Sequence, residues 1–319
     1  METSKRGQWG SSFGFLMAAI GSAIGLGNLW AFPYKMGKTG GFAFLVLYLI
    51  LVALVGVVGM LGEFALGRKT GKGAGGAYAA LGKKYSFIGW MAVISPFLIL
   101  SFYAVLGGMV LRYCLGFLVQ IFGADGFAGQ GSGFFGWLLY SGQSMILFFA
   151  LFLVCTMAIV MGGVQGGIEK FSKAVMPALG IILIGIIIFV AMQPGALEGY
   201  KFMFKPDMSL FSSPGSFFDV LKTASGQVFF SLSMAMGINI TFGSYLDKQK
   251  SLQKNAVIVP LFDTIFAVLA GMMILPACAA FHVDYAQGPG LLFASMQKVF
   301  LDGMGGQAGN IIGFLFYFL

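Results

Sequence analysis

Charged side chains are scarce in this chain. Only 9% of its 319 residues are Asp, Glu, Lys or Arg, whereas 58% are hydrophobic. A soluble domain carries about 25% charged residues, so a water-facing surface cannot be built from so few. This shortage excludes an ordinary soluble protein and indicates that the chain is folded in a lipid bilayer.

Residues that carry metal or redox chemistry are also few. The three cysteines, Cys114, Cys155 and Cys278, lie far apart and match neither a metal-ligand spacing nor a disulfide framework. His282 is the single histidine, and its position in a predicted outer loop favours a solvated or capping role. Because no paired catalytic groups are apparent, we expect that the protein is not an enzyme.

Long apolar segments are abundant instead. Segments of about 20 apolar residues match the thickness of the hydrocarbon core, and the need to pair every backbone group in lipid makes them helices. The sequence predicts an all-α membrane protein with seven full transmembrane helices and the start of an eighth. The predicted spans are roughly 13–34, 41–66, 87–122, 145–161, 174–192, 217–245 and 256–281, and the eighth begins near Ile311.

The basic residues indicate how the chain crosses the membrane. Most of them precede the first span or follow the second, fourth and sixth, and the positive-inside rule makes that side, with the N-terminus, cytoplasmic. Topology explains the net charge of +8, so we expect no nucleic-acid partner and a multi-pass protein of the cell (inner) membrane. These residues are Lys5, Arg6, Arg68, Lys69, Lys72, Lys83, Lys84, Lys170, Lys173, Lys248, Lys250 and Lys254.

Two predicted spans contain segments that suit a continuous helix poorly. Residues 21–28 include three glycines and two polar residues at mid-depth, and residues 231–237 include two serines and a glycine. Close packing on small residues explains either segment alone. Interrupted helices one and six together indicate an inverted-repeat transporter. Unwound helix ends offer N–H groups to a carboxylate and carbonyls to a cation, which suits an amino acid bound with sodium.

Several motifs resemble the neurotransmitter:sodium symporter family in its bacterial amino-acid-transporting branch. They are GLGNLW at 25–30, FPY at 32–34, GEFALGR at 62–68, GIEK at 167–170 and GQVFFSLS at 226–233. The resemblance covers the whole chain. Because members have twelve helices, it implies one C-terminally incomplete transmembrane domain over 1–319, with a first five-helix repeat at about 10–195 and a partial second repeat at about 215–319.

The resemblance implies where the amino acid binds. Its carboxylate is expected near Leu26 and Gly27, beside a sodium ion. Its ammonium is expected to face carbonyls around three residues, namely Ala23, Phe230 and Ser231.

The resemblance also implies a side-chain pocket and its lid. Tyr103 is expected to bond the carboxylate, and its ring to close over the pocket with Phe230. Met236 stands where the most studied relatives carry phenylalanine, and the flexible thioether predicts breadth across hydrophobic amino acids, aromatic ones included. Gap-filling alone is the competing interpretation. The expected pocket comprises Ile99, Tyr103, Phe230, Ser233 and Met236.

Sodium ions are the expected coupling ions. The first is expected to bind the Ala23 carbonyl, Asn28, Ser231 and Asp263. An ionised group at mid-membrane costs about 2.5–3.5 kcal/mol or more, and Asp263 is expected to supply the negative charge that chloride brings elsewhere in the family. The alternative is that Asp263 merely caps a helix nearer the cytoplasm.

Three further residues are expected around Asp263, namely Tyr48, Gln227 and Ser231. A second sodium site is expected at the Gly21 and Ile24 carbonyls, and its remaining ligands belong to helix eight, beyond Leu319.

Gates and supports complete the comparison with the family. Arg6 and Trp9 match a cytoplasmic gate with Tyr245 nearby, and Glu63 is expected to brace the unwound segments by hydrogen bonds. Ala31 replaces the usual arginine, so the usual outer salt bridge is in doubt.

Helix five carries a further pair of expected gate residues. Nine residues separate Gly167 and Pro177, a spacing that in relatives lets this helix unwind and admit water to the second sodium site. A proline kink without a gating role is the alternative.

These observations predict sodium-coupled, chloride-independent symport of a hydrophobic or aromatic amino acid into the cell by alternating access. A non-transporting amino-acid sensor with the same pocket is the alternative, and a complete seven-helix receptor is a weaker one. The sequence leaves the oligomeric state, the sodium stoichiometry and the preferred amino acid open.

Overall fold

The computed structural model describes residues 9–207, 209–247 and 249–319, and within these ranges every regular element is a helix. Within the described part of the chain, five helices are long and apolar enough to cross a membrane. They are Phe42–Thr70 (α3, Phe42–Leu51, and α4, Val57–Thr70, joined by a π-helical segment Val52–Gly56), Lys83–Ile121 (containing α6, Ser86–Ile121), α8 (Gly142–Met161), Val164–Ala191 (containing α9, Lys170–Ala191) and α13 (Leu252–Ala280).

The first predicted span is broken, as expected. Helix α1 (Ser12–Ala23) and a second helical segment, Gly27–Lys38, meet at a 45° bend. That second segment begins as a π-helix, Gly27–Ala31, and continues as α2 (Phe32–Lys38). The break is shorter than predicted, because Gly21 and Ser22 remain in α1 and only the segment after Ala23 departs from the helix. Counted as one span, this pair brings the total to six.

The sixth predicted span is also broken. Helix α11 (Pro214–Ser231) is separated from α12 (Ile238–Ser244) by six non-helical residues, 232–237. Ser233 and Ala235 have φ angles of 52° and 62°, and Gly237 has 69°. Left-handed backbone is rare for residues other than glycine, so this segment cannot continue either helix. Helices α11 and α12 are not among the span-length helices counted above.

Helix five begins earlier than predicted. The sequence places its start at 174, whereas the helix runs from Val164 to Ala191 and its first turn, Val164–Glu169, is π-helical. Lys173 therefore lies on the helix rather than in a loop, and its ammonium is paired with Glu169 at 2.6 Å. The buried member of this ion pair is Glu169, and pairing with the Lys173 ammonium lowers the cost of burying its carboxylate.

Several short helices lie between the spans and were not predicted. They are α5 (Ala74–Leu81), α7 (Phe134–Tyr140), α10 (Ala196–Phe204) and α14 (Met296–Lys298), the last lying between π-helical segments Leu291–Ser295 and Val299–Met304. The final helix, α15 (Gly306–Phe318), begins five residues before the predicted Ile311.

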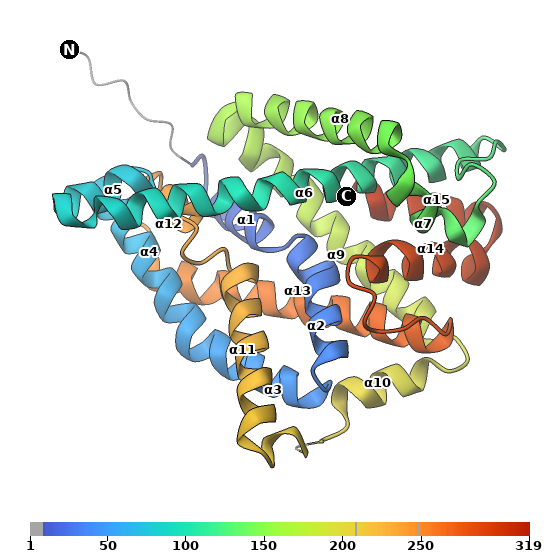
Figure 1. The fold of residues 1–319 in the computed structure, drawn as a ribbon. Helices are drawn as coiled ribbons and strands as arrows, with labels where there is room; N and C mark the ends of the chain where they lie inside the picture. The colour runs from blue at the N-terminus through green and yellow to red at the C-terminus, as the bar shows by residue number, and fades with distance from the viewer. Residues whose placement is uncertain (1–8, 208, 248) are drawn as a thin grey trace.

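Helix α13 runs through the middle of the molecule, and α6 lies beside α8 (Figure 1). Helix α13 packs against α1, α2, α4, α9 and α10. Helix α12 approaches α4 closely, because a Cβ at Gly67 would collide with the Ile240 carbonyl and one at Gly243 would meet the backbone of Phe64. The core therefore surrounds α13, and the first broken helix packs on it through α1 and α2.

Candidate functional site

Asp263 lies in the interior of α13 and its side chain is fully buried. The Nδ2 amide of Asn28 donates to Asp263 Oδ1 at 2.8 Å and to the Asp263 carbonyl at 2.9 Å. The Tyr48 hydroxyl donates to Oδ2 at 3.3 Å. A mid-helix position rules out the helix-capping alternative. The ion pairs of the described residues are Lys173–Glu169 and Lys201–Glu198, and neither involves Asp263.

Ser231 joins the same cluster from the other broken helix. Its Oγ lies 3.0 Å from Asp263 Oδ1, 2.9 Å from Oδ2 and 3.1 Å from Asn28 Oδ1. A hydroxyl has a single proton and can donate to one of these three oxygens at a time. Several oxygen lone pairs therefore converge here without a donor. Hard cations prefer oxygen ligands, so the cluster has the chemistry of a cation site.

The cluster contains one carboxylate. Within the described residues no three His, Cys, Asp or Glu side chains gather in a way that could hold a metal ion. The remaining oxygens at Asp263 come from an amide and hydroxyls. A single negative charge with neutral oxygens balances a monovalent cation.

Gln227 binds differently from the expectation that it surrounds Asp263. Its Nε2 donates to the Gly27 carbonyl at 2.9 Å, and its Oε1 is buried without a hydrogen-bond partner. Gln227 lies on α11 and Gly27 begins the π-helical segment of the first broken helix. This bond therefore ties the two broken helices together near the cation-type cluster.

A cavity of about 430 Å³ lies between the two breaks and α6. Seven of the nine predicted substrate residues line it, whereas Leu26 and Ser231 do not; Leu26 packs against the hydrophobic cluster around α6 and α15. Gly21 and Ile24, predicted for a second sodium, also line this cavity. The seven residues are Ala23, Gly27, Ile99, Tyr103, Phe230, Ser233 and Met236.

Two aromatic rings form one side of the cavity. The rings of Tyr103 and Phe230 lie 5.8 Å apart, centre to centre, in an edge-to-face arrangement with an interplanar angle of 67°. An added Cβ at Gly27 would lie 3.3 Å from the Phe230 ring and 3.6 Å from the Tyr103 hydroxyl. The first broken helix, α6 and α11 thus meet at these three residues.

Sequence reasoning missed part of the α6 wall. Pro96 and Leu100 line the cavity beside the predicted Ile99 and Tyr103. The four positions are spaced as i, i+3, i+4 and i+7, which places them on one helix face. This periodicity was available in the sequence and would have identified both residues.

Lys35 is a second residue that the sequence did not single out. Its Nζ lies 5.5 Å from the centre of the Phe230 ring, within the range of a cation–π contact. Lys35 lies on α2, four positions after Ala31. A cation of the first broken helix therefore does reach the aromatic side of the cavity, from a different position than the family pattern suggests.

Glu63 on α4 supports the second break. Its Oε1 accepts the N–H of Ala235 at 2.7 Å, and its Oε2 accepts Asn239 Nδ2 at 3.0 Å. Asn239 Nδ2 also reaches the Leu232 carbonyl at 3.0 Å. Glu63 therefore contacts both the segment between α11 and α12, at Ala235, and the first turn of α12, at Asn239.

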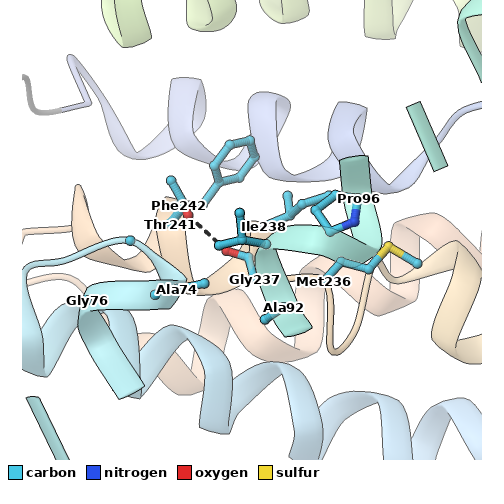
Figure 2. A pocket seen from close by; sticks show the side chains of 12 residues that line it. Ala74, Gly76, Ala92, Pro96, Met236, Gly237, Ile238, Thr241 and Phe242 are labelled. Atoms are coloured by element: carbon cyan, nitrogen blue, oxygen red, sulfur yellow. Dashed lines mark hydrogen bonds between the residues drawn. The ribbon is translucent and has the colours of Figure 1, made fainter. Parts of the chain in front are cut away.

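A second cavity of about 540 Å³ adjoins the first, between α5, α6 and α12. Figure 2 shows Pro96, Met236 and Ile238 among the residues that line it, and these three residues line both cavities. The Thr241 hydroxyl donates to the Gly237 carbonyl at 2.9 Å (Figure 2). Met236 and its two neighbours therefore form the partition between the cavities.

The predicted cytoplasmic gate is only partly described. Trp9 Nε1 donates to the Phe242 carbonyl at 3.4 Å, and the Trp9 ring contacts those of Phe15 and Phe242 edge to face. Arg6 lies outside the described residues. Tyr245 directly follows α12, and its N–H donates to the same Phe242 carbonyl at 3.2 Å. Trp9 thus connects the start of α1 to α12.

Gly167 and Pro177 both lie within the helical segment Val164–Ala191. Gly167 is in its π-helical turn and Pro177 is inside α9. The segment is wound in this conformation, and its unwinding during transport stays a prediction.

Comparison with known proteins is consistent along the chain. The family model described as "Sodium:neurotransmitter symporter family" matches residues 6–123 and 140–302. The sodium-dependent transporter YhdH of Bacillus subtilis is 34% identical over all of this chain and 70% of its own length. The inactive sodium-dependent neutral amino acid transporter B(0)AT3 of Homo sapiens is 28% identical over 85% of this chain and 46% of its own length.

A solved structure shows the same fold. The crystal structure of MhsT in complex with L-phenylalanine aligns with a TM-score of 0.88 and 40% sequence identity, covering 98% of this chain and 70% of that one. The broken helix and the apolar helices of span length are consistent with the family that the family model identifies. The chain belongs to the sodium:neurotransmitter symporter family and is a multi-pass membrane protein of a transporter, not an enzyme, family.

Proposed function

We propose that this protein carries a hydrophobic or aromatic amino acid into the cell together with sodium. The observation that carries this proposal is the meeting of both broken helices at one buried carboxylate. Asn28 from the first break and Ser231 from the end of α11 both contact Asp263. A cation at this cluster would hold the two helices that border the cavity, which couples ion binding to the shape of the substrate site.

The cavity favours an apolar substrate side chain. Ile99, Phe230 and Met236 are among its apolar lining residues, and its volume of about 430 Å³ falls within the range of small-molecule sites, about 300–1,000 Å³. MhsT was crystallised with L-phenylalanine. We assign the substrate ammonium to carbonyls near Ala23 and Phe230, and its carboxylate to the Gly27 region and Tyr103.

The first sodium is assigned to the Ala23 carbonyl, Asn28, Ser231 and Asp263, and the second to the carbonyls of Gly21 and Ile24. Because Asp263 supplies a fixed negative charge, transport is chloride-independent in this proposal. The N-terminus is cytoplasmic in the cell membrane, as the basic loops indicate.

Alternating access provides the mechanism. Sodium bound from outside orders the breaks, and Tyr103 and Phe230 close over the substrate. Inside, sodium leaves first and the amino acid follows. One sodium ion crossing about 100 mV supplies about 2.3 kcal/mol. A tenfold sodium gradient adds about 1.4 kcal/mol, and together these support accumulation of several hundredfold.

Uptake by purified protein in liposomes tests the proposal. We expect labelled phenylalanine to accumulate under an inward sodium gradient and not under a potassium gradient, with the same rate when gluconate replaces chloride. Loss of uptake in gluconate would contradict chloride independence. Sodium-dependent binding without uptake or counterflow would instead identify a sensor, which is the alternative function.

A further inference from the structure

Glu169 is a buried carboxylate that contacts the beginning of the first helix. Only 1% of the residue is exposed. Its Oε2 accepts the N–H of Gly10 at 2.8 Å, and its Oε1 accepts the Ser11 hydroxyl at 3.3 Å and the Lys173 ammonium at 2.6 Å. Residues from the start of the first helix and from the first turns of helix five therefore converge on one side chain.

The first turn of α1 is built around this carboxylate. Ser11 is the N-cap of α1, and its Oγ accepts the N–H of Gly14 at 2.9 Å while it also contacts Glu169. A Cβ at Gly14 would collide with the Glu169 carboxylate, so this glycine permits the close approach. Negative charge near a helix N-terminus is stabilised by the helix dipole. Glu169 thus completes the cap of α1 from another helix.

The local backbone leaves room for this contact to open. Helix five starts with a π-helical turn, Val164–Glu169, of which Glu169 is the last residue. The turn follows Gly163, whose φ angle is 73°. A cavity of about 520 Å³ lies beside the contact. Its lining residues are Gly10, Gln165, Glu169, Lys170, Lys173 and Ala174. Two of the three residues that contact Glu169, Gly10 and Lys173, therefore border this cavity.

Movement at this contact would reach the substrate cavity. Helix α1 is continuous from Ser12 to Ala23, and Gly21 and Ala23 line the cavity at its far end. A 12-residue helix moves as a rigid rod, and its other end is the break. A displacement of Ser11 therefore tilts the wall of the site.

We propose that Glu169 is a positioning residue that holds the inner half of the first helix, α1, against helix five, and that losing its charge frees α1 to move away. The inference rests on the proposed function for its role in transport, where release of this contact accompanies opening toward the cytoplasm. Glu169 belongs to the GIEK motif, whose contribution the substrate and sodium sites do not explain. Its partners are distinct from Trp9, which contacts α12.

The test compares Glu169→Gln with Glu198→Gln in the otherwise unchanged protein. Glu198 is the acid of the other described ion pair, with Lys201 at 2.7 Å, and it is exposed on α10. Hydrogen–deuterium exchange of the peptide covering residues 10–20 is measured in detergent without sodium or amino acid. We expect exchange in Glu169→Gln to be at least tenfold faster than in the unaltered protein, and unchanged in Glu198→Gln.

Hydrogen–deuterium exchange does not depend on transport. A negative result here therefore leaves the proposed function untouched, because that function is tested separately by sodium-dependent phenylalanine binding to the unaltered protein. Exchange in Glu169→Gln equal to that in Glu198→Gln would overturn the proposal. If Glu169→Gln does not fold, Ser11→Ala and Lys173→Met each remove one partner, and each should speed exchange of the same peptide about threefold. Unchanged exchange in both would also overturn it.

Discussion

The carboxylate of Glu63 accepts the backbone N–H of Ala235 at 2.7 Å, across 172 residues of sequence. Ala235 lies in the left-handed region of φ and has no helical partner for this N–H. The second carboxylate oxygen accepts Asn239 Nδ2 at 3.0 Å. One side chain of α4 therefore sets the shape of the break between α11 and α12.

Replacing Glu63 with alanine should weaken substrate binding. The change removes the carboxylate that accepts the Ala235 N–H and the buried Asn239 amide. A hydrogen bond to a charged group contributes about 1.5–3 kcal/mol, and a loss of about 1.4 kcal/mol corresponds to tenfold in affinity. We expect sodium-dependent phenylalanine binding to weaken by about tenfold or more in a scintillation proximity assay. Glu63→Gln retains an acceptor and should lose less; equal affinity in Glu63→Ala and the unaltered protein would refute this role.

The variant Asp263→Asn should make phenylalanine binding respond to chloride. The substitution keeps the size of the side chain but removes the fixed negative charge beside Asn28 and Ser231. We expect weak binding in sodium gluconate and recovery by about tenfold in sodium chloride, whereas the unaltered protein binds equally in both salts. If Asp263→Asn binds phenylalanine as tightly as the unaltered protein in both salts, Asp263 is not part of the sodium site.

Lys35→Gln should release bound amino acid faster. The ammonium of Lys35 lies 5.5 Å from the Phe230 ring centre, and a cation–π contact contributes about 0.5–2 kcal/mol. We expect the dissociation rate of labelled phenylalanine to rise about threefold to tenfold. Lys38→Gln is the matched control, because Lys38 is exposed on the same helix and lies 6.0 Å from the Tyr34 ring. A similar rise in both variants would indicate a general charge effect rather than a role for Lys35.

Two glycines of the GEFALG motif should differ in their tolerance of alanine. A Cβ at Gly67 would collide with the Ile240 carbonyl and approach the Ser244 nitrogen at 2.9 Å, whereas one at Gly62 meets nothing within 4 Å. Overpacking costs about 1–3 kcal/mol. We expect Gly67→Ala to lower the melting temperature in detergent by several degrees and Gly62→Ala to leave it unchanged or raise it. The reverse order would show that α4 and α12 do not pack as described.

The motifs predicted features that depend on a single continuous stretch of sequence, such as the two helix breaks. GLGNLW and GQVFFSLS located both breaks, because glycine and polar residues at mid-depth are costly in an ordinary membrane helix. The bounds were less accurate: Gly21 and Ser22 remain helical, since the helix tolerates small residues when its neighbours pack closely. Pro96 and Leu100 could have been found from the helical spacing around Ile99 and Tyr103.

Contacts that depend on tertiary geometry could not be predicted in this way. Lys35 reaches Phe230 only because the first helix bends by 45° before α2, and no sequence pattern gives the direction of a bend. The early start of helix five was also missed because it depends on tertiary contacts. Lys170 and Lys173 were assigned to the loop between the fourth and fifth spans, whereas Glu169 pairs with Lys173 and accepts hydrogen bonds from Gly10 and Ser11.

Ser233 and Ala235 have a consequence for how the second break moves. A break made of glycines would be a flexible hinge, since glycine adopts the left-handed backbone conformation without steric cost. Side chains at these two positions leave few alternative conformations, and holding such a backbone costs about 1–2 kcal/mol per residue. The segment between α11 and α12 is therefore conformationally restricted. We expect α12 to rotate together with this segment as a rigid body.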